Sequence, residues 1–195
     1  IIPGVRTLSK VLDLLNYHEG SFNQINMDSL FKQVVDTLCL FSEYGTNNLD
    51  LLTSAYNFHP ALIKIISESQ NSDLRIACCT LVTRLCHKNK DNKHVVIFLQ
   101  QCKTPAVEPS DLLQAFKTIL RDPESSTKLV CAVLLCFSNL VADTSPEAMP
   151  IILRSHIYED TLLPLLLDER FHRESEIQCE LAYSFTNAFI VAKDF

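Results

Sequence analysis

Glycine is scarce and tryptophan is absent from this chain of 195 residues. The three glycines, Gly4, Gly20 and Gly45, stand alone, and few runs alternate apolar with polar residues. Strands joined by tight turns need more glycine and more alternation than this. The sequence therefore predicts an all-α protein.

Sequence signatures of catalysis and cofactor binding are also missing. Isolated glycines cannot form a phosphate-binding loop, and the six histidines never occur at His-x-x-x-His spacing. No Cys-x-x-Cys pair and no Cys/His quartet at zinc spacing occurs. We therefore expect a protein that is not an enzyme and that holds no metal and no other cofactor.

An excess of basic residues and a long apolar run are lacking too. The formal net charge is −6 at pH 7, which disfavours a nucleic-acid partner. No apolar run reaches the length of about 18 residues that spans a bilayer, and no signal peptide opens the chain. We expect no membrane association. The start at Ile1 without methionine and the end at Phe195 just past a repeat helix predict a fragment of a longer protein.

Eight cysteines are present, and they have two interpretations. A disulfide framework is one, and reduced core residues are the other. The second is favoured because free cysteine is a common small core residue in reducing compartments, which predicts the cytoplasm or the nucleus. Seven of them lie within or at the end of apolar helical runs: Cys39, Cys78, Cys79, Cys86, Cys131, Cys136 and Cys179.

The clearest positive signal is a helix predicted over residues 175–191. With Ile177 counted as position one, its apolar side chains recur at helical spacing, and Tyr183 and Asn187 share a second face. The apolar face consists of Ile177, Leu181, Ser184/Phe185 and Ala188. The same register fits segments that start at residues 74 and 129, and more weakly one that starts at residue 31. The four starts, at residues 31, 74, 129 and 177, are separated by 43, 55 and 48 residues, which indicates an array of repeats.

Each repeat is predicted to contain a first, a second and a longer third helix. The four units cover about residues 1–46, 47–92, 93–144 and 145–195. The proline-containing loop over residues 103–110 accounts for the longest spacing. Because faces this apolar must stack on neighbours to be buried, we predict one domain, a right-handed α-solenoid of about four armadillo/HEAT-like repeats.

The third helices resemble those of importin-α type armadillo repeats. In ELAYSFTNAF, Tyr183 stands where that family has Trp, and Asn187 stands where it has Asn. In AVLLCFSNL, Leu135 and Asn139 occupy these two places. The segment IYEDTLLPLLL resembles the family's second helix, which commonly carries a Leu-Pro pair. The resemblance implies a concave groove that binds protein segments, but a receptor for basic nuclear localisation signals is disfavoured because the tryptophan slots are missing and Arg84 is basic.

A possible role of the asparagines can also be argued from their chemistry, independently of any family resemblance. An amide offers one acceptor and two donor hydrogens, so it can pair with the backbone of an extended peptide. The alternative is that Asn139 and Asn187 only cap or bridge helices, that Tyr183 packs, and that the basic groups are solvated. The residues predicted to bind a partner are Asn187, Tyr183, Asn139, Leu135, Arg84, Thr80, Lys128 and Glu180.

These patterns predict an adaptor-like interaction module whose partner is a protein or peptide segment, extended or partly helical, lying along the third helices. A structural scaffold that acts through its convex surface or loops, or that self-associates, is the main alternative. A regulatory fragment of a larger enzyme or transport factor is a third interpretation. The alignment of exposed Asn, Tyr and Arg side chains distinguishes the first two.

Overall fold

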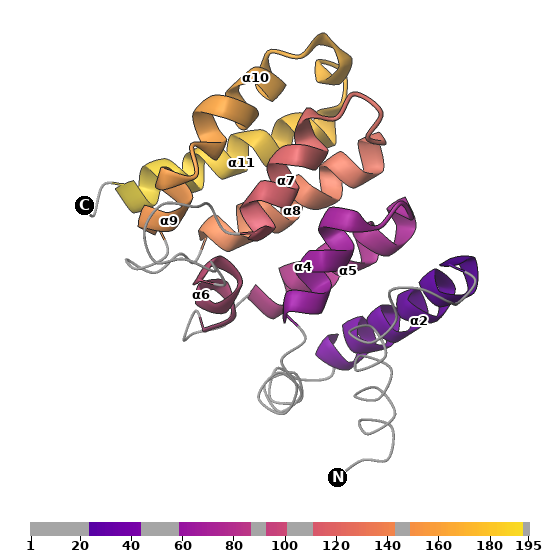
Figure 1. Cartoon of the computed structure of the whole chain (residues 1–195). Helices are drawn as coiled ribbons and strands as arrows, with labels where there is room; N and C mark the ends of the chain where they lie inside the picture. Colours follow the sequence, from indigo (N-terminus) through magenta and orange to yellow (C-terminus); the bar gives the residue numbers. More distant parts are fainter. Residues whose placement is uncertain (1–23, 44–58, 87–92, 101–110, 143–148, 193–195) are drawn as a thin grey trace. The chain divides into compact units, whose positions relative to one another are not determined.

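A computed structural model describes residues 24–43, 59–86, 93–100, 111–142 and 149–192 (Figure 1). Every regular segment within these ranges is helical and none is a strand, which confirms the predicted all-α class for the described part. The α-helices are α2 (Gln24–Glu43), α4 (His59–Glu68), α5 (Ser72–Cys86), α6 (Lys93–Gln100), α7 (Asp111–Arg121), α8 (Thr127–Ala142), α9 (Met149–Arg154), α10 (Leu163–Leu166) and α11 (Ser175–Ala192). A π-helical turn, η1 (Tyr158–Leu162), and a 3-10 turn, η2 (Glu169–Phe171), complete the order.

The helices predicted as the third of each repeat are α2, α5, α8 and α11. The predicted helix over 175–191 matches α11 to within one residue, and Ile177 and Leu181 on its apolar face are fully buried. The predicted first helices over residues 3–15 and 48–56, and the loop over 103–110, lie outside the described residues.

The chain divides into two compact units, Ile1–Leu85 and Cys86–Phe195, which we call the first and the second compact unit. The division falls close to the predicted boundary between the second and third repeats at residues 92 and 93. The single domain of four repeats stays a prediction.

In the first compact unit, α4 leads into α5 through a short capped turn. Asn71 is the N-cap of α5, since its Oδ1 accepts a hydrogen bond from the backbone N–H of Leu74 at 3.1 Å. Arg75 Nε donates to the backbone oxygen of Ile66 at 2.8 Å and so ties the two helices together. Their apolar faces form the core of this unit, with Leu62, Ile66, Leu74, Cys78, Leu81 and Val82 almost fully buried.

In the second compact unit, α8 packs against α11 and against the preceding helix α7 (Figure 1). Ser126 caps α8 by accepting a hydrogen bond from the N–H of Leu129 at 3.3 Å. The largest fully buried side chains of this unit are Phe98, Phe116 and Phe137, which come from α6, α7 and α8. Three successive helices therefore contribute to one core.

The cysteines within the described ranges are free thiols, and five of the seven are buried. Burial raises the pKa of the Cys78 thiol far above its ordinary value, and it does the same for Cys86. These thiols therefore act as apolar core groups, as the sequence predicts. Among the described helices, none combines the length and the hydrophobicity that crossing a bilayer requires.

Candidate partner-binding site

Six of the eight residues predicted to bind a partner lie on α8 and α11, and we call this surface the α8–α11 face. Leu135 and Tyr183 both occupy position seven of their helices, and their exposed fractions are 44% and 61%. Exposed apolar and aromatic side chains at equivalent positions of packed helices are candidate anchors for a partner. The α8–α11 face consists of Lys128, Leu135, Asn139, Glu180, Tyr183 and Asn187.

The polar residues at the seam between α8 and α11 contact one another. Ser138 Oγ donates a hydrogen bond to Glu180 Oε2 at 2.8 Å. Asn187 Nδ2 donates to the backbone oxygen of Ser138 at 3.2 Å. Glu180 and Asn187 are therefore half-buried bridging groups in this structure. That contact is the one expected if Asn187 bridges adjacent helices, and its amide oxygen can still accept a hydrogen bond.

The other two polar residues of the α8–α11 face, Asn139 and Lys128, lie on α8. Asn139 Nδ2 donates to the backbone oxygen of Leu135 in its own helix at 2.8 Å. Lys128 is exposed at the start of α8. Neither the hydrogen bond of Asn139 nor the exposure of Lys128 decides whether a partner binds, so the assignment of these residues to a groove stays a prediction.

A half-buried thiol lies at the same seam, one turn from its N-terminal end. Cys131 Sγ is 3.9 Å from Glu176 Oε2. Burial, followed by the negative charges of Glu176, Glu174 and Glu180, raises the pKa of this thiol. Nucleophilic cysteines need a lowered pKa, so this raised pKa disfavours Cys131 as a reactive group.

The other two predicted residues, Thr80 and Arg84, lie on α5 in the first compact unit. Arg84 Nη1 donates to the backbone oxygen of Cys39 on α2 at 2.6 Å. Thr80 Oγ1 donates to the backbone oxygen of Ile76 at 2.9 Å. Both residues line a cavity between α2 and α5. The structure therefore groups the predicted residues into two sets, one in each compact unit.

Two of the residues at position eleven, Arg84 and Asn187, contact a neighbouring helix, whereas the amide of Asn139 bonds to Leu135 within its own helix. Arg84 and Asn187 each donate from position eleven to a main-chain oxygen of the preceding third helix. Arg84 and Asn187 are predicted to bind a partner, and the structure places both in the contact between two helices.

Replacing Asn187 with alanine is expected to lower the free energy of unfolding by about 1 kcal/mol, because the bridge to Ser138 is lost. Chemical denaturation measures the difference. Thr186→Ala is the matched control, since the Thr186 hydroxyl bonds to Ala182 within α11. Equal effects of the two substitutions would show that the bridge contributes nothing.

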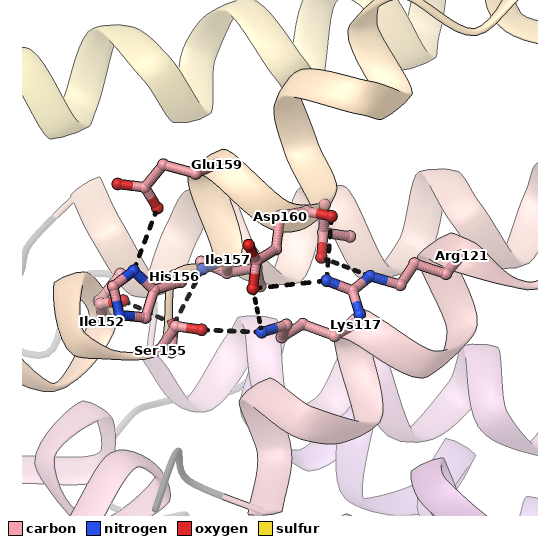
Figure 2. Close-up of polar contacts among 9 residues, drawn as sticks. Lys117, Arg121, Ile152, Ser155, His156, Ile157, Glu159 and Asp160 are labelled. Atoms are coloured by element: carbon pink, nitrogen blue, oxygen red, sulfur yellow. Dashed lines mark hydrogen bonds and ion pairs between the residues drawn. The ribbon is translucent and has the colours of Figure 1, made fainter. Parts of the chain in front are cut away.

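Figure 2 shows a polar cluster around Lys117 of α7 that no sequence pattern predicts. Lys117 is buried, and its Nζ donates to the backbone oxygen of Ser155 at 2.9 Å and to Asp160 Oδ2 at 3.1 Å. Arg121 Nε donates to Thr161 Oγ1 at 3.1 Å, and Arg121 Nη2 donates to the backbone oxygen of Asp160 at 3.0 Å. Lys117 and Arg121, one turn apart on α7, therefore bind the chain just before and within η1.

The π-helical turn has a local cause. Pro164 has no N–H, so it cannot donate to the oxygen of Asp160 four residues earlier, and its ring crowds that oxygen. The helical turn is wider by one residue there, since the N–H of Leu163 bonds to the oxygen of Tyr158, five residues earlier. The oxygen of Asp160 accepts a hydrogen bond from Arg121 instead of one from residue 164. His156 precedes the turn with a φ of 54°, the left-handed conformation that ends α9. The helical structure that precedes α10 therefore includes the π-helical turn from Tyr158 to Leu162.

The wide turn places Tyr158 between α8 and α11. Its ring centroid lies 5.6 Å from that of Phe137 and 5.5 Å from that of Phe185. Its hydroxyl donates to the backbone oxygen of Ser184 at 3.2 Å, and burial raises its pKa well above the ordinary value. Tyr158 therefore supports the α8–α11 face from beneath.

Acid is expected to weaken this arrangement through Asp160. The hydrogen bond from Lys117 and the positive charges of Lys117 and Arg121 hold the pKa of Asp160 below its usual range. The stabilisation is complete above the unfolded-state pKa of about 3.9 and is lost as the pH falls through the lower folded-state value. Asp160→Asn should thus reduce the melting temperature at pH 7, and the gap to the wild type should close in strong acid. A gap that persists in acid, or one equal to that of the exposed Glu169→Gln control, would contradict this assignment.

The described residues contain no group of three or more His, Cys, Asp or Glu side chains arranged to hold a metal ion. Comparisons with known proteins identify no family, since no protein-family model and no curated protein matches the chain. An engineered protein whose crystal structure comes from the Northeast Structural Genomics Consortium resembles it with a TM-score of 0.43 and 14% sequence identity. The match covers 93% of this chain and 79% of that one. A likeness this low supports no argument about fold or function.

Proposed function

We propose that this protein is a non-enzymatic interaction module that binds an extended or partly helical segment of a partner protein along its third helices. The observation that carries the proposal is the exposure of Leu135 and Tyr183 at the same position of two packed helices. A few side chains supply most of the binding energy at protein interfaces, and tyrosine is among the enriched types. An apolar neighbour such as Leu135 adds to the area that a partner segment can cover.

The proposal includes a right-handed α-solenoid of armadillo/HEAT-like repeats. Support comes from the direction and the offset of the third helices within each unit. The contact from Arg84 to Cys39 joins residues 45 apart, and so does the contact from Cys131 to Glu176. In each pair of helices, residues earlier in one helix lie near residues earlier in the other, and the same holds for later residues. The two helices of each pair therefore run parallel. Other contacts between α8 and α11 join residues 42 and 49 apart, so the offsets are similar rather than equal. Parallel third helices at similar offsets are what stacked repeats require.

We also propose the cytoplasm or the nucleus as its location. The free thiols of the described residues support this, because a reducing compartment keeps cysteines unpaired.

The test is a selection of displayed peptides against the full chain, followed by affinity measurements with the enriched peptides. Leu135→Ser combined with Tyr183→Ser should weaken binding at least tenfold, because two anchors are removed from the α8–α11 face. The matched control is Leu163→Ser combined with Leu167→Ser, since these exposed leucines lie on and just after α10. Circular dichroism checks that all variants remain folded. The absence of any enriched peptide would overturn the proposal.

A scaffold that acts through other surfaces is the second candidate. The exposed Leu163 and Leu167 favour it, because they are large apolar side chains on and just after α10 that do not belong to the α8–α11 face. Under this alternative the α10 variant, and not the α8–α11 variant, changes association with a partner or with a second copy. The same pair of variants therefore separates the two functions.

A further inference from the structure

The side of α8 that contacts α11 follows a regular stripe. Cys131 Sγ is 3.9 Å from Glu176 Oε2, and Ser138 Oγ donates to Glu180 Oε2 at 2.8 Å. Leu134 lies between Cys131 and Ser138 at helical spacing, and it is fully buried. α11 therefore lies along a stripe of α8 that presents a thiol, an apolar group and a hydroxyl in this order.

α11 carries the same stripe on a side of its own. The two helices share one register, in which each residue of α11 corresponds to the residue of α8 that is 48 positions earlier. The residues that correspond to the stripe of α8 are Cys179, Ala182 and Thr186, which again are a thiol, an apolar group and a hydroxyl in this order. Three residues further along both stripes, Val141 of α8 corresponds to Phe189 of α11.

The two stripes differ in burial. Val141 is fully buried, whereas 70% of Phe189 is exposed, and so is 59% of its neighbour Ile190. Adjacent large apolar side chains on one exposed face are typical of an interaction surface. We call this surface the outer face of α11, and it consists of Cys179, Ala182, Thr186, Phe189 and Ile190, all of which are exposed.

We propose that the outer face of α11 binds an amphipathic helix of a partner protein, parallel to α11, in the same way that α8 binds α11. This helix has two carboxylates four residues apart, as Glu176 and Glu180 are, and an apolar residue follows each of them. The first carboxylate lies at Cys179 and the second lies at Thr186. The surface is distinct from the α8–α11 face, so the inference goes beyond the proposed function and does not rest on it.

The hydroxyl of Thr186 can serve this helix as the hydroxyl of Ser138 serves α11. Thr186 Oγ1 donates to the backbone oxygen of Ala182 at 2.8 Å. Ser138 Oγ has a comparable acceptor in its own helix, the oxygen of Leu135 at 3.1 Å, and it also reaches the carboxylate of Glu180. A charged acceptor forms a stronger hydrogen bond than a neutral one, so a carboxylate of the partner can draw the Thr186 hydroxyl away from Ala182.

A second copy of the chain fits this face less well than a partner helix. The side of α11 with the required carboxylates is engaged with α8, where Glu180 and Asn187 bond to Ser138. Two copies that met through their outer faces would bring no carboxylate to each other, because that face consists of a thiol, a hydroxyl and apolar groups. The face therefore lacks the acceptors that its own donors would pair with.

The experiment measures the binding of a fluorescently labelled peptide of 18 residues to the full chain by fluorescence anisotropy. The peptide has the sequence of α11, except that the five outer-face residues are replaced with glutamine or lysine. It should bind, and a peptide of the same composition in scrambled order should not. Glu176→Ala combined with Glu180→Ala in the peptide should weaken binding by about threefold to tenfold. Gln178→Ala, on another side of the peptide helix, is the control for this loss.

Variants of the full chain then assign binding to the outer face. Ala182→Glu and Phe189→Glu should each weaken binding at least about tenfold, because each places an unpaired charge in the contact. Both residues are exposed, so the fold should tolerate the changes, and circular dichroism checks this. Leu153→Glu is the matched control, because Leu153 is an exposed apolar residue on α9, with an exposed fraction of 50%.

The outcomes separate the inference from the proposed function. If the helical peptide does not bind, or binds equally well to the two outer-face variants, the inference is overturned. If Leu135→Ser and not Phe189→Glu weakens its binding, the peptide occupies the α8–α11 face, so the inference is overturned and the proposed function stands. If sedimentation of the chain alone shows a dimer that Phe189→Glu abolishes, the occupant is a second copy and the inference is overturned.

Discussion

Replacing Phe137 with alanine is expected to lower the free energy of unfolding by about 3 to 5 kcal/mol, the range for an aromatic side chain removed from a core. Phe137 is fully buried on α8, and its ring contacts Tyr158 edge to face. The cavity left behind would lie between α8 and the turn that supports the α8–α11 face. Denaturation followed by far-UV circular dichroism measures the change, because the chain has no tryptophan to report by fluorescence.

Phe189→Ala is the control for this prediction. Phe189 is the same residue type on α11, but 70% of it is exposed. Its replacement should change stability by less than about 0.5 kcal/mol. Similar losses for the two phenylalanines would mean that Phe137 is not part of a packed core.

Replacing Tyr158 with alanine is expected to cost about 2 to 4 kcal/mol. The substitution removes two ring contacts, to Phe137 and Phe185, and the hydroxyl that donates to the oxygen of Ser184. Tyr158→Phe keeps the ring and removes only that hydrogen bond, so it should cost about 1 kcal/mol. Equal losses for the two variants would contradict the role of the ring.

The two substitutions should not be additive. Phe137 and Tyr158 contact each other, so the double variant should lose less than the sum of the single losses, by about 0.5 to 1.5 kcal/mol. A strictly additive result would indicate that the rings pack independently. Measuring all four proteins under the same conditions gives this coupling energy.

The sequence predicts the third helices well because their buried faces follow a local rule. Leu74, Cys78 and Val82 recur every four residues, and all three are buried in the first compact unit. The same periodicity in α11 places Tyr183 on the exposed side. Periodicity depends only on neighbours along the chain, so it can be read without knowledge of the fold.

The cluster around Lys117 could not be predicted in this way. A lysine on an amphipathic helix is normally solvated, and its two partners lie 38 and 43 residues away. The bridges from Arg84 and Asn187 are hidden for the same reason, since their acceptors are main-chain oxygens that any residue could supply. The one local signal for this region was Pro164, because a proline inside a helix interrupts the helical hydrogen bonds.

The contacts around Pro164 also determine how the chain can be divided. Arg121 of one predicted repeat supplies the donor that Asp160 of the next repeat lacks, and Arg170 Nη1 donates back to the oxygen of Pro123 at 3.0 Å. A fragment that begins after α8 would lose both bonds and the apolar surface of α8 that α11 covers. We expect that such a fragment does not fold independently. The smallest transplantable part at this end is then expected to be a pair of the predicted repeats, with a design boundary before α6 and not between α8 and α9.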